Sequence, residues 1–81
     1  MEKAEFNRIL GNYVKKKRIE MGWSQADLAE KVGNNFQNIS RVERGEISPT
    51  LFWCTLLADA FELTITEFID EAFGSIKELN S

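Results

Sequence analysis

Side-chain amides gather between residues 32 and 40, where the sequence reads VGNNFQNIS. Amides compete with the backbone for hydrogen bonds and lower helix propensity, so this stretch is a poor choice for a helix that only builds a core. Each amide both donates and accepts, which suits hydrogen-bonded recognition. The amide residues are Asn34, Asn35, Gln37 and Asn38, with Phe36 among them.

The sequence contains few residue patterns of the kind that carry out catalysis. The chain has no histidine, so the usual general base and commonest metal ligand are absent. Its one cysteine, Cys54, lies in the apolar run LFWCTLLA, which favours a buried and inert thiol. Acidic residues are scattered without the spacing of metal ligands. We therefore expect no enzymatic activity, no metal and no cofactor.

The composition limits the fold class and the compartment. A chain of 81 residues, 43% hydrophobic and with a single proline, fits one small helical domain. Its apolar stretches are too short to span a membrane, and the charged start MEKAEFNRIL does not resemble a signal peptide. A lone cysteine forms no intrachain disulfide, so we expect a reduced, cytoplasmic protein without membrane contact.

Charge is divided unevenly along the chain. Residues 1–45 hold nine Lys/Arg against six Asp/Glu, a balance of +3, whereas residues 46–81 hold one against seven, a balance of −6. This division favours a cationic working half and an anionic half that faces elsewhere. The basic run KKKR at residues 15–18 is equally consistent with a solvated helix face.

Apolar residues repeat at spacings of three and four in five segments, and no useful stretch alternates with period two, so the sequence predicts five helices and no strands. The expected helices span about 6–21, 24–33, 35–45 and 50–61, and a fifth begins at 64. The fourth is expected to bury Leu51, Cys54, Leu57, Ala58 and Phe61. The expected inward residues of the other helices are Phe6, Leu10, Tyr13, Val14, Leu28, Ala29, Val32, Ile39, Val42, Phe68, Ile69, Ala72 and Phe73.

Local capping signals mark where four of these helices start. Ser24 with Asp27, and Thr64 with Glu67, have the spacing of a capping box. The other expected N-caps are Asn35 and Thr50. These signals place the amide-rich stretch at the start of the third helix.

The second and third expected helices are short and are joined by the turn GNN at residues 33–35. Two helices with a short glycine turn form a helix-turn-helix, whose second helix enters the major groove of DNA. Gly33 supplies the left-handed backbone of the turn, and Ala29 must be small because the helices cross close to it. The ordered set is Gln25, Leu28, Ala29, Gly33, Ile39 and Val42.

The stretch GWSQADLAEKVGNNFQNISRVERGEISP resembles the Cro/repressor-type (XRE) helix-turn-helix regulators and is similar to the DNA-binding domains of lambdoid phage repressors. YVKKKRIEMG before it and TLFWCTLLADAFELTITEFI after it also match, so the resemblance covers residues 10–69. It implies an all-α, five-helix lambda-repressor-like domain that binds DNA as a dimer. Residues 1–9 would be an N-terminal segment and the start of helix one, and residues 70–81 a C-terminal extension.

The resemblance also implies roles for particular residues. Gln25 would donate to a phosphate, and Arg44 would reach the DNA backbone. The side chains facing the groove would be Asn35, Phe36, Gln37, Asn38 and Arg41. Amides match the N6/N7 edge of adenine and arginine matches the O6/N7 edge of guanine, while Phe36 would contact a thymine methyl or a sugar.

Structural alternatives stand beside these roles. Phe36 can pack against Gly33 or a loop, and Gln25 can be an ordinary surface residue. Asn34 fits a turn residue that tolerates the left-handed region, and Asn35 can do no more than cap a helix. Arg18 and Glu43 match a pair that forms an internal salt bridge in such repressors, while a solvated basic stripe remains open for Arg18.

Two departures from the family pattern concern the second half of the chain. Glu62 stands where family members usually carry glycine after helix four, so that turn must close without it. Phe52 and Leu56 form an apolar ridge beside Trp53 that the core stripe does not explain. Either the C-terminal tail covers this ridge, with Phe73, Ile76 and Leu79 as partners, or two subunits share it.

The sequence thus predicts a double-stranded-DNA-binding repressor that acts as a homodimer on a palindromic operator. The homodimer would form through Phe52, Trp53, Leu56 and the C-terminal segment. The alternative is a protein-interaction module, such as an antitoxin whose apolar C-terminal half binds a partner protein.

Overall fold

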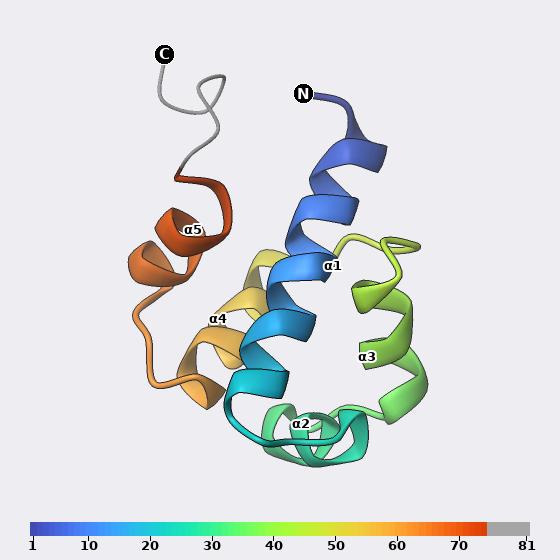
Figure 1. Cartoon of the computed structure of the whole chain (residues 1–81), viewed down its shortest axis with the longest axis vertical. Helices are drawn as coiled ribbons and strands as arrows, with labels where there is room; N and C mark the ends of the chain where they lie inside the picture. The colour runs from blue at the N-terminus through green and yellow to red at the C-terminus, as the bar shows by residue number, and fades with distance from the viewer. Residues whose placement is uncertain (75–81) are drawn as a thin grey trace.

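The computed structural model describes residues 1–74 and shows five helices (Figure 1). They are α1 (Lys3–Glu20), α2 (Gln25–Val32), α3 (Phe36–Glu43), α4 (Leu51–Ala60) and α5 (Ile65–Phe73). This described part contains no strand, so the expected all-α fold is confirmed. None of its helices is both long and apolar enough to cross a membrane. α1 contacts both α3 and α5, which lie on opposite sides of it (Figure 1).

Four helices begin at the expected caps. The hydroxyl of Ser24 accepts from the Asp27 N–H at 3.0 Å, and the Asp27 carboxylate accepts from the Ser24 N–H at 2.8 Å. Thr64 and Glu67 form the second capping box in the same way, at 3.0 and 2.9 Å. The remaining caps are Asn35 for α3 and Thr50 for α4. Local sequence signals therefore set these helix starts.

α1 begins earlier than expected, at Lys3 rather than near Phe6. Its first turn carries no apolar stripe, which is why periodicity missed it. Lys3, Ala4 and Glu5 all have high helix propensity, and the Glu5 carboxylate complements the positive end of the helix. The helix therefore extends over them. It ends as expected, before Gly22 at φ 78°.

The core receives apolar side chains from all five helices. Ile69 of α5, which was expected to face inward, is 36% exposed instead, so that prediction is wrong; the stripe of α5 reaches the core through Phe68 and Phe73.

The stripe of α4 fails at its first residue, because Leu51 is 72% exposed rather than buried. Cys54 and Leu57 are buried further along α4, but its first turn extends past the core. The Cys54 thiol is buried, as the sequence predicts, and burial raises its pKa.

Gly11 brings α1 close to α3, a contact that the sequence analysis did not predict. A Cβ at this position would collide with the backbone carbonyl oxygens of Val42 and Glu43 at the end of α3. Those carbonyls are backbone atoms and cannot rotate away as a flexible side chain would. The absence of a side chain at Gly11 is therefore a condition of this helix crossing.

The loop between α3 and α4 is also held against α1. The Ser48 hydroxyl donates to the side-chain oxygen of the buried Asn7. Gly45, at φ 75°, lies against the backbone of Arg8. These contacts fix the path of the chain as it leaves α3.

The turn between α4 and α5 places Glu62 in the left-handed region, at φ 60°. It is the position where the family pattern suggests glycine. A residue with a Cβ pays roughly 1–2 kcal/mol for that backbone conformation. The turn closes without glycine, as the sequence requires, but with local strain.

Replacing Gly11 by alanine should lower the free energy of unfolding by about 3 kcal/mol, at the upper end of the range for overpacking. Urea denaturation measures the change. The exposed neighbour Asn12, changed to alanine, is the matched control and should alter stability by less than about 0.5 kcal/mol. An unchanged midpoint for Gly11→Ala would contradict the close crossing of α1 and α3.

Replacing Glu62 by glycine should stabilise the protein, because it removes the left-handed strain. The net gain should be about 0.5–1 kcal/mol, since glycine also loses more chain entropy on folding. Thermal unfolding provides the measurement. Asp59→Gly, which puts glycine inside regular α4, should lower the transition temperature instead. A lower transition temperature for Glu62→Gly would show that strain is not the dominant effect there.

Candidate nucleic-acid interface

The turn between α2 and α3 has the geometry that its sequence predicts. Gly33 adopts the left-handed conformation, at φ 69° and ψ 34°, and the Asn34 N–H donates to the Ala29 carbonyl at 2.9 Å. Leu28 and Ala29 of α2 are buried in one core cluster with Ile39 of α3. No atom lies within 4 Å of an added Cβ at Gly33, so backbone conformation alone calls for glycine. The two helices form a helix-turn-helix.

Two of the amides build the start of α3. The Asn35 side-chain oxygen accepts from the Asn38 N–H at 2.9 Å and so caps the helix. The Asn34 side-chain oxygen accepts from the Asn35 N–H and from Asn38 Nδ2, both at 2.8 Å. Asn34 is a turn residue, but it does not use the left-handed region that the sequence analysis considered. Its role is to hydrogen-bond the first turn of α3.

The outward face of α3 carries the remaining candidates. Phe36 is 50% exposed, and Gln37 and Arg41 are exposed, while Asn38 is half-buried. Gln37 has no side-chain hydrogen bond to any residue from 1 to 74. Ile39 lies on the opposite, buried face. The packing thus leaves the Gln37 amide free for an external partner.

An ion pair between Arg18 and Glu43 fixes α3 against α1. Arg18 Nε and Nη2 donate to the two carboxylate oxygens at 2.7 and 3.1 Å, and these side chains are 11% and 3% exposed. Arg18 Nη1 donates to the Trp23 carbonyl at 2.7 Å. The structural pairing inferred for Arg18 is confirmed. Its guanidinium is therefore committed to the fold.

Gln25 joins this ion pair instead of projecting freely. Its Nε2 donates to Glu43 Oε1 at 3.1 Å, and the residue is half-buried at the start of α2. The surface-residue alternative is therefore wrong, because the amide serves a structural hydrogen bond. An amide nitrogen has a second N–H, so a phosphate contact by Gln25 stays a prediction.

Glu46 is a neighbour of the interface that the sequence analysis missed. Its carboxylate accepts from Arg44 Nε at 2.6 Å and Nη2 at 3.2 Å, and it lies 4.0 Å from Arg41 Nε. Arg44 Nη1 also donates to the Ser40 hydroxyl. The Arg44 guanidinium holds the pKa of Glu46 below its ordinary value. Both arginines thus have an anionic neighbour on their own chain.

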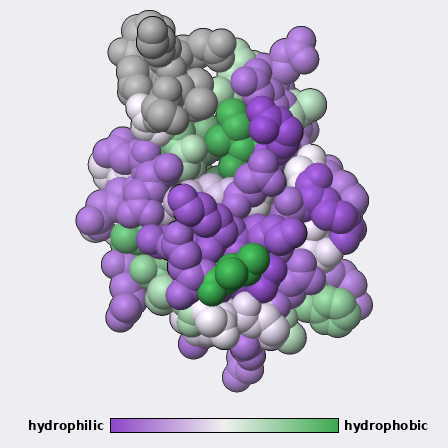
Figure 2. Space-filling view, viewed as in Figure 1, coloured by the Kyte–Doolittle hydropathy of each residue, from purple (hydrophilic) through white to green (hydrophobic). Residues whose placement is uncertain are grey.

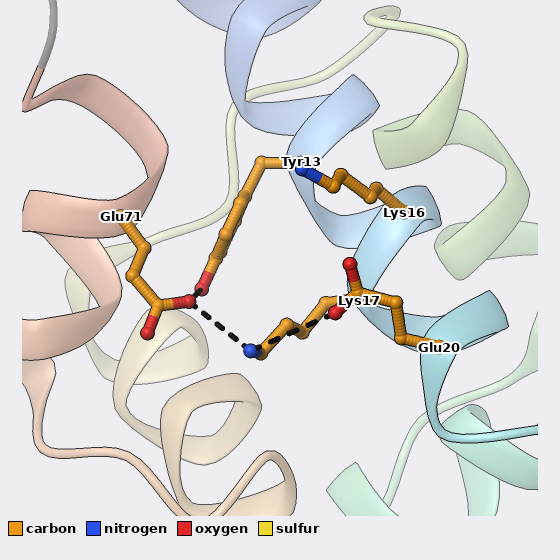
Figure 3. Close-up of a pocket in the computed structure, with 5 residues that line it drawn as sticks. All are labelled: Tyr13, Lys16, Lys17, Glu20 and Glu71. Atoms are coloured by element: carbon orange, nitrogen blue, oxygen red, sulfur yellow. Dashed lines mark hydrogen bonds and ion pairs between the residues drawn. The ribbon is translucent and has the colours of Figure 1, made fainter.

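The basic run at residues 15–18 is only partly solvated. Lys17 Nζ lies 3.2 Å from Glu71 of α5, and the Tyr13 hydroxyl donates to the same carboxylate at 2.6 Å (Figure 3). Burial, together with the Glu71 hydrogen bond, raises the pKa of Tyr13. Arg18 is committed to Glu43, so Lys15 and Lys16 are the exposed members of the run, and Lys16 adds to the positive charge that lowers the pKa of Glu71. This cluster joins α1 to α5.

The apolar ridge on α4 is narrower than expected. Phe52 is 72% exposed, but Trp53 and Leu56 are half-buried and pack against the core. Exposed Leu51 adds to Phe52 at the same end of α4. By contrast, the face seen in Figure 2, over α1, is mostly hydrophilic with separate apolar spots.

Phe73 is not available to cover the ridge. It is 2% exposed and stacks on Phe6 of α1 with ring centroids 4.8 Å apart. Its expected role as a ridge partner is therefore wrong, because it completes the contact of α5 with α1. Ile76 and Leu79, the other expected partners, lie outside the described residues.

Comparison with known proteins agrees with this geometry. The helix-turn-helix family HTH_3 matches residues 14–68. The chain is 32% identical over 56 residues to the HTH-type transcriptional regulator YgzD of Bacillus subtilis (strain 168), covering 69% of this chain and 85% of that protein.

Solved structures have the same fold. The restriction-modification controller protein C.AhdI from Aeromonas hydrophila is 25% identical, with a TM-score of 0.77 over 84% of this chain and 99% of that chain. The clp gene regulator ClgR from Corynebacterium glutamicum is 22% identical, with a TM-score of 0.78 over 91% of this chain and 79% of that chain. The chain therefore belongs to the helix-turn-helix family HTH_3, a family of DNA-binding transcriptional regulators rather than enzymes.

Proposed function

We propose that this chain is a sequence-specific repressor that binds a palindromic operator in double-stranded DNA as a homodimer. The observation that carries the proposal is the outward face of α3, where Gln37 and Arg41 are exposed on a helix anchored by its other face. The similarity to proteins described as a gene regulator and a restriction-modification controller supports a role in transcription. Such a protein would act where the DNA lies, in the cytoplasm.

Reading of bases would centre on Gln37 and Arg41, which are four residues apart and so share a helix face. The Gln37 amide matches adenine, and the Arg41 guanidinium matches guanine. Half-exposed Phe36 would contact a thymine methyl or a sugar. Asn38 and Asn35 would contribute less, because each already makes hydrogen bonds within the first turn of α3.

Phosphate contacts would set the register of the protein on DNA. Gln25 would use its second N–H, and Arg44 would approach the backbone from the end of α3. Such contacts carry no direct sequence information, but they release counter-ions and make binding depend on salt. Base readout and phosphate binding would thus come from different residues.

Dimerisation would use the exposed end of α4. Leu51 and Phe52 form an adjacent apolar pair there, and a second copy of the chain would bury it across a two-fold axis, together with Trp53, Leu56 and the C-terminal segment. Two α3 helices about 34–36 Å apart would then enter successive major grooves.

The same exposed pair supports a second candidate function. A partner protein of a different sequence could cover Leu51 and Phe52, as in an antitoxin that also represses its own operon. A self-complementary dimer argues for the first function, and a monomer that associates only with another chain argues for the second.

Gln37→Ala should abolish preference at one base pair in each half-site, at a cost of about 1–3 kcal/mol for the preferred base. Selection of binding sites from random duplex DNA, followed by competition binding, measures the loss. Gln25→Ala is the matched amide comparison and should weaken binding to all sequences about equally. Recovery of the parental motif with Gln37→Ala would contradict base reading, and recovery of no motif by the parent protein at low salt would contradict the proposed function.

Phe52→Asp should convert the dimer to a monomer, because it places a charge in the apolar contact. We expect the dimer dissociation constant to rise about tenfold or more in sedimentation experiments, as for a residue central to an interface. Ile19→Asp is the control, since Ile19 is also exposed, at 57%, but belongs to α1. Equal dissociation constants for the two variants would exclude Phe52 from the dimer contact.

A further inference from the structure

Glu46 is placed where it competes with DNA for two arginines. Its carboxylate makes a two-point contact with Arg44, at 2.6 and 3.2 Å, and lies 4.0 Å from Arg41. Arg41 is a proposed base reader and Arg44 a proposed phosphate contact. One carboxylate therefore faces both functional cations at the end of α3.

Three of the five N–H groups of the Arg44 guanidinium donate to side chains on its own chain. Nε and Nη2 face Glu46, and Nη1 donates to the Ser40 hydroxyl, so all three nitrogens are engaged within residues 40–46. A phosphate must either share this group or displace Glu46 from it. The pKa of Glu46 is lowered by Arg44, so the carboxylate is ionised at neutral pH and repels an approaching phosphate.

Within residues 1–74, no hydrogen bond or ion pair joins the Glu46 carboxylate to a core residue. The Arg44 and Glu46 side chains are 55% and 49% exposed, and the Glu46 carboxylate pairs with the two arginines. An ion pair this exposed to solvent contributes little to stability. The pair is thus weak enough to exchange for DNA, unlike the enclosed pair of Arg18 with Glu43.

We propose that Glu46 is an internal counter-ion that limits non-specific DNA binding by offsetting one of the two positive charges of Arg44 and Arg41 in the free protein. The proposal rests on the DNA-binding function proposed above. If Arg44 keeps Glu46, the pair neutralises no phosphate. If Arg44 binds a phosphate instead, the Glu46 carboxylate loses its partner and attracts a cation from solution. In both cases binding releases about one counter-ion fewer than it would without the carboxylate.

The test is Glu46→Gln, with binding to a duplex of arbitrary sequence measured across a salt series. Affinity at low salt should rise, and the slope of log K against log salt should become more negative by about 0.9, the value for one further phosphate. Glu46→Asp keeps the charge and should keep most of the parental slope. Glu62→Gln makes the same charge change in the α4–α5 turn and should leave the slope unchanged.

The slope of log K against log salt distinguishes this role of Glu46 from a structural role. A parental slope for Glu46→Gln, or weaker binding, would overturn the proposal even if the parent protein binds DNA well. Failure of the parent protein to bind any duplex at low salt would overturn both this proposal and the proposed function. Thermal unfolding of Glu46→Gln close to that of the parent would show that the change in slope does not come from a damaged fold.

Discussion

The enclosed ion pair between Arg18 and Glu43 is the interaction on which the arrangement of the interface depends. It joins α1 to the last turn of α3 by two hydrogen bonds, and Gln25 adds a third from α2. Removing one partner from such a pair leaves an uncompensated charge and costs about 3–5 kcal/mol. Gly11 sets the distance between the same two helices, because any side chain there would meet the Glu43 carbonyl. The ion pair and Gly11 together therefore fix the position of α3 and its distance from α1.

A helix held in this way can devote its outer face to recognition. The amides at its start divide between two tasks, since Asn34 and Asn35 satisfy the backbone of the turn and the first turn, while the Gln37 side chain makes no hydrogen bond within residues 1–74. Phe36 keeps half of its surface exposed, so the structure does not assign it to the core. Unfavourable helix propensity is thereby confined to positions where an amide caps, or where it faces outward.

The charged side chains of residues 1–74 are also divided between those that pair within the fold and those that stay unpaired on the surface. The excess of Lys and Arg in residues 1–45 suggests a strongly cationic face, but several of these groups face carboxylates on the same chain. Lys17 lies beside Glu71, Arg18 is enclosed with Glu43, and Arg44 faces Glu46. We infer that a protein of net charge −3 with these cations paired attracts phosphate less strongly than its number of Lys and Arg residues suggests. Selectivity for particular sequences would then depend more on base contacts.

Local features could be predicted from the sequence: the caps at Ser24 and Thr64, the left-handed turn at Gly33 and most of the apolar stripes, because these signals act within one or two helical turns. The pairing of Arg18 with Glu43, which is distant in the sequence, was inferred from the resemblance to a family. Only the tertiary structure decided which helix ends are covered and where helices nearly touch, because these depend on crossing angles and on residues far apart in the chain. That is why the sequence did not reveal the need for Gly11, the exposure of Leu51, the burial of Phe73 on α1 or the position of Glu46 between two arginines.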